Sequence, residues 1–333
     1  MEKRLVHHDN LKAALMFLVL FGHLLELVPG HWAGVLYRVI YSFHMPLFLF
    51  LTGYFARFRP RRILLFQLWP YFLLQTLYLV FDARVLQGGA AVTLQYTTPY
   101  WLLWYLLAVI LYQLLLPLLD TDRLSLQILA VAGSLLLSLL VGYDRTIGYY
   151  MTLSRFFVFL PFFLLGCYAR KHGAVEALRE RKSARLAVLL SGGVLAFLGL
   201  LFIKFAHVQA TALYGSASYA ALGYSPITRG ALFLTALGWC AFLLMLAPGK
   251  PIPVVTALGR RTFCIFCLHG FAVRLLKLCR PFRFGQGGNL LLAAALAAAL
   301  LLVLGSKPVS EVFSWVFTGK WLDRLAQRRK KDT

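Results

Sequence analysis

Long apolar segments alternate with short polar connections along the whole chain. Each apolar segment holds 17 to 21 residues, and about 20 residues of α-helix are needed to cross the hydrocarbon core of a bilayer. The pattern therefore predicts an all-α, polytopic transmembrane helical bundle with ten spans, at residues 11–29, 37–56, 63–81, 100–119, 126–142, 153–169, 186–206, 227–247, 262–279 and 289–306. The stretch 207–225 is expected to lie outside the membrane or to re-enter it.

Basic residues gather in alternate connections, which predicts the orientation of the spans. Lys and Arg are enriched in three connections, residues 57–62, 170–185 and 307–333. Short cytoplasmic loops carry such an excess of Lys and Arg. The N-terminal residues 1–12 are basic as well, so we expect both termini to lie in the cytoplasm. One group of basic residues, at positions 274–283 near the outer end of the ninth span, departs from this rule.

The composition excludes an ordinary soluble domain. The chain is 60% hydrophobic and only 14% charged, whereas soluble domains are about 45–50% apolar and about 25% charged. In a soluble protein a formal charge of +22 would indicate nucleic acid, but here it follows the topology, so we expect membrane lipid and no nucleic acid as a partner. We predict one membrane-embedded domain, 1–306, and a basic cytoplasmic tail, 307–333, in a multi-pass protein of the inner or plasma membrane.

Two histidines interrupt the first two predicted spans. His23 and His44 should lie at similar depth, because a short loop makes these helices antiparallel. An ionisable side chain inside a span is costly and indicates a functional site, although hydrogen bonding between helices would also explain it. Glu26 follows His23 on the same helical face and could orient its imidazole. Pro46 is expected to kink the second span around His44.

The hairpin that these spans form resembles a known family. It is similar to the opening of the acyltransferase-3 family of integral membrane O-acyltransferases, and most similar to the fucose 4-O-acetylase-like branch. The family's basic residue–ten residues–His pattern falls on Lys12 and His23, and its Arg-x-x-Arg pattern falls on Arg59 and Arg62. Further matches are Asp9, Gly22, Phe43 to Phe48, and Gly53 to Phe55. Thr52 stands where the family usually has Ser, and Lys12 where many members have Arg.

The resemblance implies an acyltransferase that transfers groups other than aminoacyl groups. The donor would be a cytoplasmic acyl-coenzyme A, expected to be acetyl-CoA, and the acceptor a hydroxyl of a cell-surface glycan or lipid-linked sugar. His23 would act as general base, assisted by Glu26. His44 would either donate to the tetrahedral oxyanion or carry the acyl group transiently, and both roles stay open. No metal is expected.

Three basic residues of the motifs are predicted to bind the donor. Lys12, Arg59 and Arg62 would pair with the phosphates of the coenzyme. Their alternative role is to anchor the cytoplasmic side of the helices. Lys12 and His23 are eleven residues apart, about 16 Å along a helix, a distance that the pantetheine arm could span.

Three later residues are predicted to contact substrate. Arg155 begins the family's Arg-plus-Phe-Pro-Phe-Phe segment and needs a partner, which could be Glu26, Asp144 or an anionic substrate, unless it snorkels to the interface. His269 resembles the family's late Tyr-x-x-His histidine, with packing as its alternative. Trp104 could stack on a sugar or belong to an aromatic belt.

Two other functions use the same residues. A transporter or flippase of a glycolipid or small metabolite could use His23 and Glu26 as a proton relay, but the sequence has no visible internal repeat to support it. The third possible function is that of a membrane partner, without catalytic activity, in a glycan-synthesis complex. The number of subunits is not predicted.

Overall fold

A computed structural model describes residues 6–317, and within them every regular element is helical. The elements are α1 (Val6–Leu25), α2 (His31–Tyr41), α3 (His44–Phe55), α4 (Pro60–Ile63), η1 (Leu64–Leu68), α5 (Trp69–Phe81), η2 (Asp82–Leu86), η3 (Trp101–Leu103), α6 (Trp104–Leu119), α7 (Leu124–Leu140), η4 (Val141–Tyr143), η5 (Tyr150–Thr152), α8 (Leu153–Lys171), α9 (Ala174–Glu180), α10 (Lys182–Phe205), η6 (Ala210–Tyr214), α11 (Tyr219–Leu222), α12 (Pro226–Leu246), α13 (Pro253–Gly259), α14 (Thr262–Cys279), α15 (Gln286–Leu304) and α16 (Lys307–Phe317).

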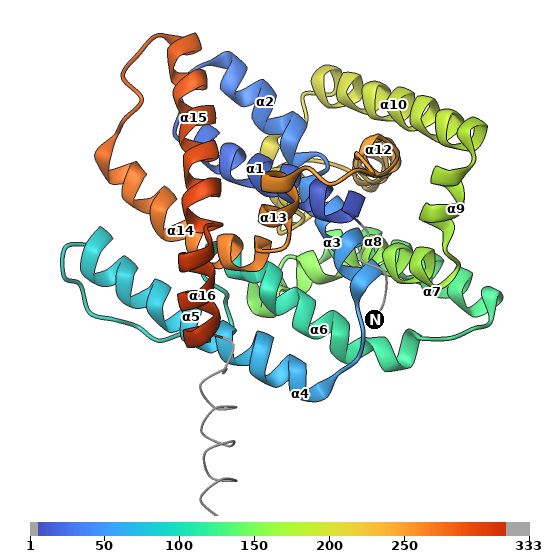
Figure 1. Ribbon diagram of the computed structural model, residues 1–333, viewed down its shortest axis with the longest axis horizontal. Coiled ribbons are helices and arrows are strands. Elements are labelled where there is room, and N and C mark those ends of the chain that lie inside the picture. The colour runs from blue at the N-terminus through green and yellow to red at the C-terminus, as the bar shows by residue number, and fades with distance from the viewer. Residues whose placement is uncertain (1–5, 318–333) are drawn as a thin grey trace, which may run out of the picture.

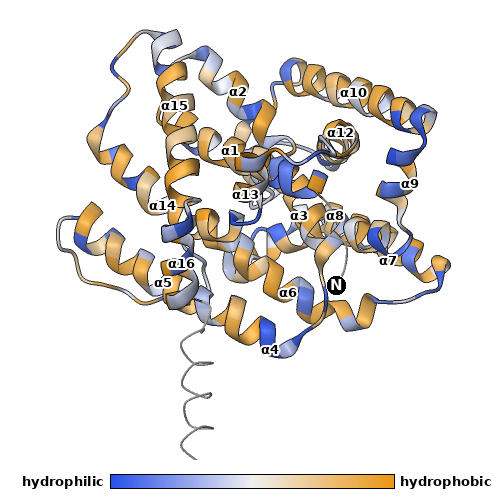
Figure 2. Ribbon diagram, viewed as in Figure 1, coloured by the Kyte–Doolittle hydropathy of each residue, from blue (hydrophilic) through white to orange (hydrophobic). Residues whose placement is uncertain are grey.

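The described helices confirm a polytopic helical bundle. Nine helical segments in the described range are long and apolar enough to cross a membrane, and they correspond to the second to tenth predicted spans. Apolar residues cover most of α10, α12 and α15, while hydrophilic residues gather in α4, α9 and the connections (Figure 2). α14 begins and ends where the ninth span was predicted.

The helix at the first predicted span, α1, is not among these nine segments, and it begins earlier than expected. α1 starts at Val6 and ends at Leu25, so residues 6–12 are its first turns and not a loop. These turns are polar and yet buried, because Asn10 donates to the carbonyls of Pro248 and Lys250 before α13. α1 therefore runs through the middle of the bundle, against α13, α15, α2 and α14 (Figure 1).

The second predicted span is two helices, and Pro46 does not kink it. The break between α2 and α3 falls at Ser42 and Phe43, just before His44. Phe43 has a non-helical φ of −142°. Pro46 lies in the first turn of α3, where a missing N–H costs no helical hydrogen bond. His44 is thus the first residue of a helix.

α3 and α8 cross at two glycines. A Cβ on Gly53 would lie 1.9 Å from the carbonyl oxygen of Phe163, and a Cβ on Gly166 would lie 2.0 Å from that of Phe50. Both distances are far below van der Waals contact, so only glycine allows this approach. The crossing fixes α3, which begins at His44, against α8, which carries Arg155.

The regions flanking the spans are more helical than expected. The third span is one continuous run, Pro60–Leu86, with π-helical turns at η1 and η2. The tail begins as α16, which packs on α5, α14 and α15 through Phe313 and Phe317. Residues 318–333 of the predicted basic tail lie outside the described part of the chain.

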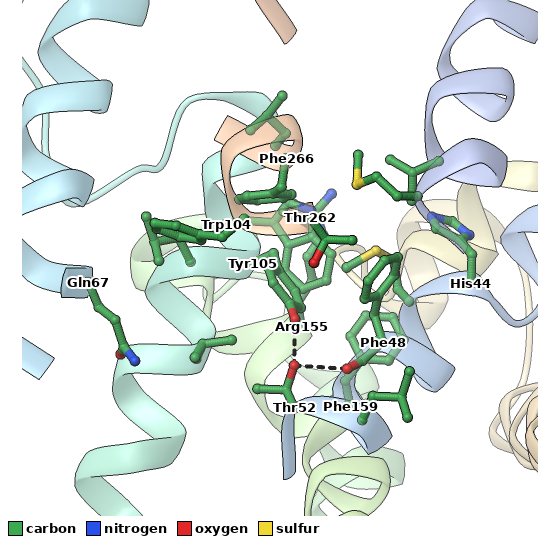
Figure 3. Close-up of a pocket in the computed structure, with 18 of the residues that line it drawn as sticks. His44, Phe48, Thr52, Gln67, Trp104, Tyr105, Arg155, Phe159, Thr262 and Phe266 are labelled. Atoms are coloured by element: carbon green, nitrogen blue, oxygen red, sulfur yellow. Dashed lines mark hydrogen bonds between the residues drawn. The ribbon is translucent and has the colours of Figure 1, made fainter. Parts of the chain in front are cut away.

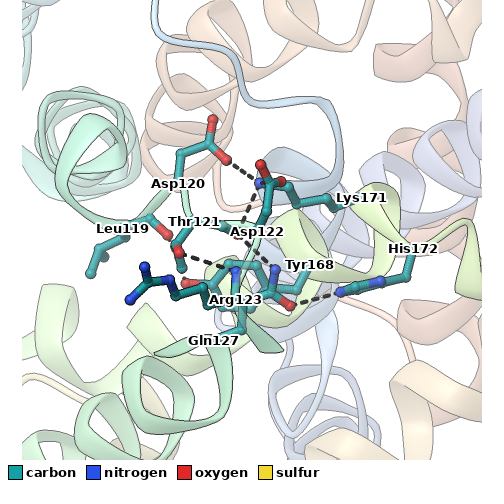
Figure 4. A network of polar contacts seen from close by, with 9 residues as sticks. All are labelled: Leu119, Asp120, Thr121, Asp122, Arg123, Gln127, Tyr168, Lys171 and His172. Carbon is teal, nitrogen blue, oxygen red and sulfur yellow. Dashed lines mark hydrogen bonds and ion pairs between the residues drawn. The ribbon is translucent and has the colours of Figure 1, made fainter. Parts of the chain in front are cut away.

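A polar network joins the α6–α7 turn to the end of α8 (Figure 4). Lys171 contacts Asp120 at 2.8 Å and Asp122 at 2.7 Å. His172 Nε2 lies 2.7 Å from Gln127 Oε1. Hydrogen bonds from Lys171 hold the pKa of the Asp122 carboxyl below its ordinary value. The network ties three helices together at one end of the bundle.

Candidate active site

One cavity of about 890 Å³ contains every residue that the sequence analysis assigned to the site. Its walls come from α1, α2, α3, α6, α8, η6 and α14, together with the segments that follow α1 and α3 and precede α6 and α8. The predicted residues that line it are Lys12, His23, Glu26, His44, Arg59, Arg62, Trp104, Arg155 and His269. Residues far apart in the sequence therefore share a single space.

The cavity has a histidine end and a basic end. The histidine end comprises His23, Glu26, His44 and His269, and the basic end comprises Lys12, Arg57, Arg59 and Arg62. α3 runs from His44 to Phe55, a rise of about 16 Å, and the arginines follow it. The two ends are thus separated by roughly the length of one helix.

Three side chains form the centre of the histidine end. Nδ1 of His23 lies 3.2 Å from Glu26 Oε1 and 3.0 Å from the hydroxyl of Tyr41. Tyr41 donates its own proton to Glu26 at 2.7 Å, so Nδ1 of His23 carries the proton that these oxygens accept. Nε2 of His23 is then unprotonated and can act as a base. Tyr37 also donates to Glu26, at 3.2 Å.

His269 stacks on His23. The ring centroids are 5.5 Å apart at an interplanar angle of 23°, and Trp101 covers His23 at 4.6 Å. Nδ1 of His269 donates to the carbonyls of Phe266 at 2.7 Å and Ile265 at 3.2 Å. Nε2 of His269 is therefore unprotonated, and it is buried without a hydrogen-bond partner.

His44 also contacts Tyr41. Their ring centroids are 4.5 Å apart, and those of Tyr41 and His23 are 6.2 Å apart, so both predicted catalytic histidines lie against the same tyrosine. Nδ1 of His44 donates to the carbonyl of Ile40 at 2.9 Å, across the break between α2 and α3. This bond leaves Nε2 as the basic nitrogen. The helix break thus gives His44 its orientation.

Arg155 meets aromatic rings and a carbonyl instead of a carboxylate. Its guanidinium carbon lies 4.8 Å from the Trp104 ring and 5.1 Å from the Tyr149 ring. Nε donates to the carbonyl of Tyr214 at 3.1 Å. Neither of the proposed acidic partners contacts it. Asp144 instead accepts from the N–H groups of residues 146 and 147, which lower the pKa of its carboxyl.

At the basic end, Lys12 has a partner within the protein. Lys12 Nζ lies 2.8 Å from Asp9 Oδ1 and 5.2 Å from the Phe55 ring centroid. Arg62 lies over the ring of Phe66. Arg57, which was not singled out from the sequence, lines the cavity beside the two predicted arginines. Arg61 is not among the lining residues.

Several lining residues carry hydroxyl or amide side chains that were given no role in the site from the sequence, although Thr52 was noted as a departure from the family. Nothing in the sequence distinguishes Tyr41 from the other tyrosines of the chain, which has 16 in all. Thr52 donates to the carbonyl of Phe48 at 2.8 Å and meets the hydroxyl of Tyr105 at 2.5 Å (Figure 3). Ser would offer the same hydroxyl, which explains why Thr can replace it here. Oε1 of Gln67 is buried without a partner.

One group of side chains has the chemistry of a metal site, although it lies outside the cavity lining. One ligand atom from each of His7, His8 and Glu176 lies within 4.8 Å of the other two. Both ring nitrogens of His8 are buried without a hydrogen-bond partner. Tyr54 donates its hydroxyl to Glu176. Neither histidine was assigned a role from the sequence.

Comparisons with known proteins agree with the earlier resemblance at the level of the family. The chain is 40% identical over 60 residues to nodulation protein NolL of Sinorhizobium fredii (strain NBRC 101917 / NGR234), an alignment that spans 16% of each chain. No solved structure matches. The likeness to the fucose 4-O-acetylase-like branch stays a prediction. The family described as acyltransferase domain matches residues 8–306, almost the whole described chain, and this protein therefore belongs to the acyltransferase-3 family.

Proposed function

We propose that this membrane acyltransferase moves an acyl group, specifically acetyl, from cytoplasmic acetyl-CoA to a hydroxyl of a cell-surface glycan or lipid-linked sugar. The observation that carries the proposal is the single cavity, which holds a basic end suited to phosphates and a histidine end suited to proton transfer. Acyl transfer from a coenzyme A thioester to an alcohol needs both, about one pantetheine arm apart.

His23 is the general base in this proposal. Nε2 takes the proton of the acceptor hydroxyl while its oxygen attacks the acyl carbon. The same proton then neutralises the coenzyme A thiolate, which leaves in this step or, where His44 carries the acyl group, in the step before. The Glu26 carboxylate beside Nδ1 stabilises the imidazolium that forms in between. Tyr41 and Tyr37 hold Glu26 in place through their hydroxyls.

His44 fits one of its two expected roles better than the other. Its Nδ1 proton is engaged by the carbonyl of Ile40, so a neutral His44 has no second proton to donate to an oxyanion. Its unprotonated Nε2 can instead attack the acyl carbon and carry the acyl group transiently. This tautomer supports the transient carrier.

The basic end has the charge that the donor requires. Lys12, Arg57, Arg59 and Arg62 line it, and the planar guanidinium binds phosphate oxygens in pairs. Thr52 and Tyr105 offer hydroxyls on the cavity wall between the ends (Figure 3). These groups suit a polar pantetheine arm.

The test compares His23→Gln with His31→Gln at matched expression. His31 is exposed at the start of α2 and does not line the cavity. Surface glycans from cells with each variant are analysed by mass spectrometry for acetyl groups, and purified proteins are assayed for release of coenzyme A. We expect His23→Gln to lose about 10²-fold or more in transfer and His31→Gln to keep it.

Two results would contradict the proposal. If the His23→Gln variant acetylates surface glycans to the same extent as the unmodified protein, His23 is not the general base. Unchanged glycans together with an altered distribution of a glycolipid across the membrane would instead favour a flippase.

A further inference from the structure

Arg155 is a cation inside the cavity that the protein itself does not neutralise. Within residues 6–317 it makes no ion pair, and its one hydrogen bond goes to the neutral carbonyl of Tyr214. The rings of Trp104 and Tyr149 lie against it. Arg155 is half-buried. A charge withdrawn from water without a partner is costly, and a ligand of opposite charge compensates that cost when it binds.

The acid nearest in the cavity is already engaged. Glu26 is the single Asp or Glu that lines the cavity in the described chain, and it accepts from His23, Tyr37 and Tyr41. The cavity therefore carries unbalanced positive charge at Arg155.

The donor phosphates match the basic end better than they match Arg155. Tyr214 links the arginine to the histidine end, because its carbonyl accepts from Arg155 and its hydroxyl contacts that of Tyr37. The basic end lies about one helix length away, roughly 16 Å along α3. The reacting end of an acetyl thioester is uncharged. An anion at Arg155 therefore fits the acceptor better than the donor.

We propose, on the basis of the proposed function, that the acceptor is an anionic sugar whose carboxylate or phosphate binds Arg155 while its ring stacks on Trp104 or Tyr149. The bond from Nε to Tyr214 fixes the guanidinium plane and leaves the two terminal NH₂ groups for paired contacts with anionic oxygens. Aromatic faces beside a cation suit the apolar face of a sugar. The charge on the acceptor thus selects which hydroxyl reaches His23.

The test measures binding of small probes to the full-length protein in lipid nanodiscs at 0.15 M salt, where exposed charges are screened beyond about 8 Å. The probes are methyl glucuronide, glucose 1-phosphate and neutral methyl glucoside, and the readout is the dissociation constant. We expect at least one charged probe to bind about tenfold or more tightly than the glucoside. A preference for glucuronide identifies a sugar carboxylate, and one for the phosphate identifies a lipid-linked sugar phosphate.

Arg155→Gln should abolish this preference and leave the affinity for coenzyme A unchanged. Arg274→Gln is the matched control, because Arg274 also stacks on an aromatic ring, Trp101 at 4.7 Å, but does not line the cavity. Equal affinity for all three probes in the unmodified protein overturns the inference. Loss of coenzyme A affinity in Arg155→Gln also overturns it, by assigning the arginine to the donor.

The outcome is separable from the proposed function. If His23→Gln keeps full acetyl transfer, the general-base proposal fails whatever the probes show. If His23→Gln loses transfer but Arg155→Gln keeps the charge preference, only the anionic acceptor is wrong.

Discussion

The imidazole of His269 stacks on that of His23, with ring centroids 5.5 Å apart, although 246 residues separate them in the sequence. His269 presents an unprotonated Nε2 without a hydrogen-bond partner to this region. A ring kept only for packing would work equally well as phenylalanine. Replacing the ring by phenylalanine therefore tests which of the two roles that the sequence left open applies to His269.

His269→Phe keeps an aromatic ring beside His23 and removes Nε2. We expect acetyl transfer to fall about tenfold or more, because Nε2 can no longer accept a hydrogen bond of about 1.4 kcal/mol from the substrate. Thermal stability should stay unchanged. Steady-state transfer and a thermal unfolding scan in detergent measure both quantities. Full activity in His269→Phe would show that the histidine only packs.

Tyr41 is predicted to position the base. Its hydroxyl donates to Glu26 at 2.7 Å and accepts from His23, so Tyr41→Phe removes a hydrogen bond to a charged group, worth about 1.5–3 kcal/mol. We expect kcat to fall about tenfold or more and the KM for acetyl-CoA to stay the same. Tyr37→Phe, which loses a longer contact of 3.2 Å, should cost less. An equal loss in both variants would mean that Tyr41 has no special role.

The arginines after α3 should separate donor binding from chemistry. Arg59→Gln and Arg62→Gln each remove a cavity-lining charge, whereas Arg61→Gln changes a neighbour that does not line the cavity. We expect the first two to raise the KM for acetyl-CoA about tenfold, as one charged hydrogen bond of about 1.4 kcal/mol would, and Arg61→Gln to change it little. Equal effects from all three would indicate a general surface charge.

Much of this site could be predicted because its residues break the hydrophobic pattern. His23, His44 and Arg155 stand out in apolar spans where charge is costly, and the spacing of Lys12, Arg59 and Arg62 carries the family resemblance. The cavity brings all of them together. Their individual roles remain predictions.

The elements that escaped prediction depend on tertiary contacts. Hydropathy could not locate the break at Ser42 and Phe43, because both sides of it are apolar and Pro46 gave a stronger local signal. The polar turns of α1 were expected to precede the helix because their partners before α13 lie more than 230 residues away. Tyr41 was missed for a similar reason, since its importance comes from Glu26 and His23 and not from its neighbours.

The glycine crossing of α3 and α8 gives a prediction about stability. Gly53→Ala or Gly166→Ala would press a Cβ to within 2.0 Å of a backbone oxygen, so we expect a loss of about 1–3 kcal/mol or more and a lower unfolding temperature. Gly133→Ala in α7 meets nothing within 4 Å and should stabilise by about 0.5–1 kcal/mol. If all three variants unfold at the same temperature, the helices do not cross this closely.

His8 gives a prediction whose sign reports on metal binding. The side chain is 0% exposed, and neither ring nitrogen has a partner, while the rings of Tyr54 and Phe55 lie 4.5 and 5.2 Å away. A buried polar group without a hydrogen bond costs about 1–3 kcal/mol, and an apolar group of similar shape removes that cost. His8→Phe should therefore unfold at an equal or higher temperature than the unmodified protein, with exposed His31→Phe as the control.

The opposite sign would have a specific meaning. If His8→Phe unfolds at a lower temperature, and a chelator lowers the unfolding temperature of the unmodified protein but not of the variant, then His8 binds a metal ion together with His7 and Glu176. Elemental analysis of both purified proteins checks this directly, because loss of a ligand should release the ion. Equal metal content near zero, with no effect of the chelator, leaves His8 as a buried histidine whose ring is held by its aromatic neighbours.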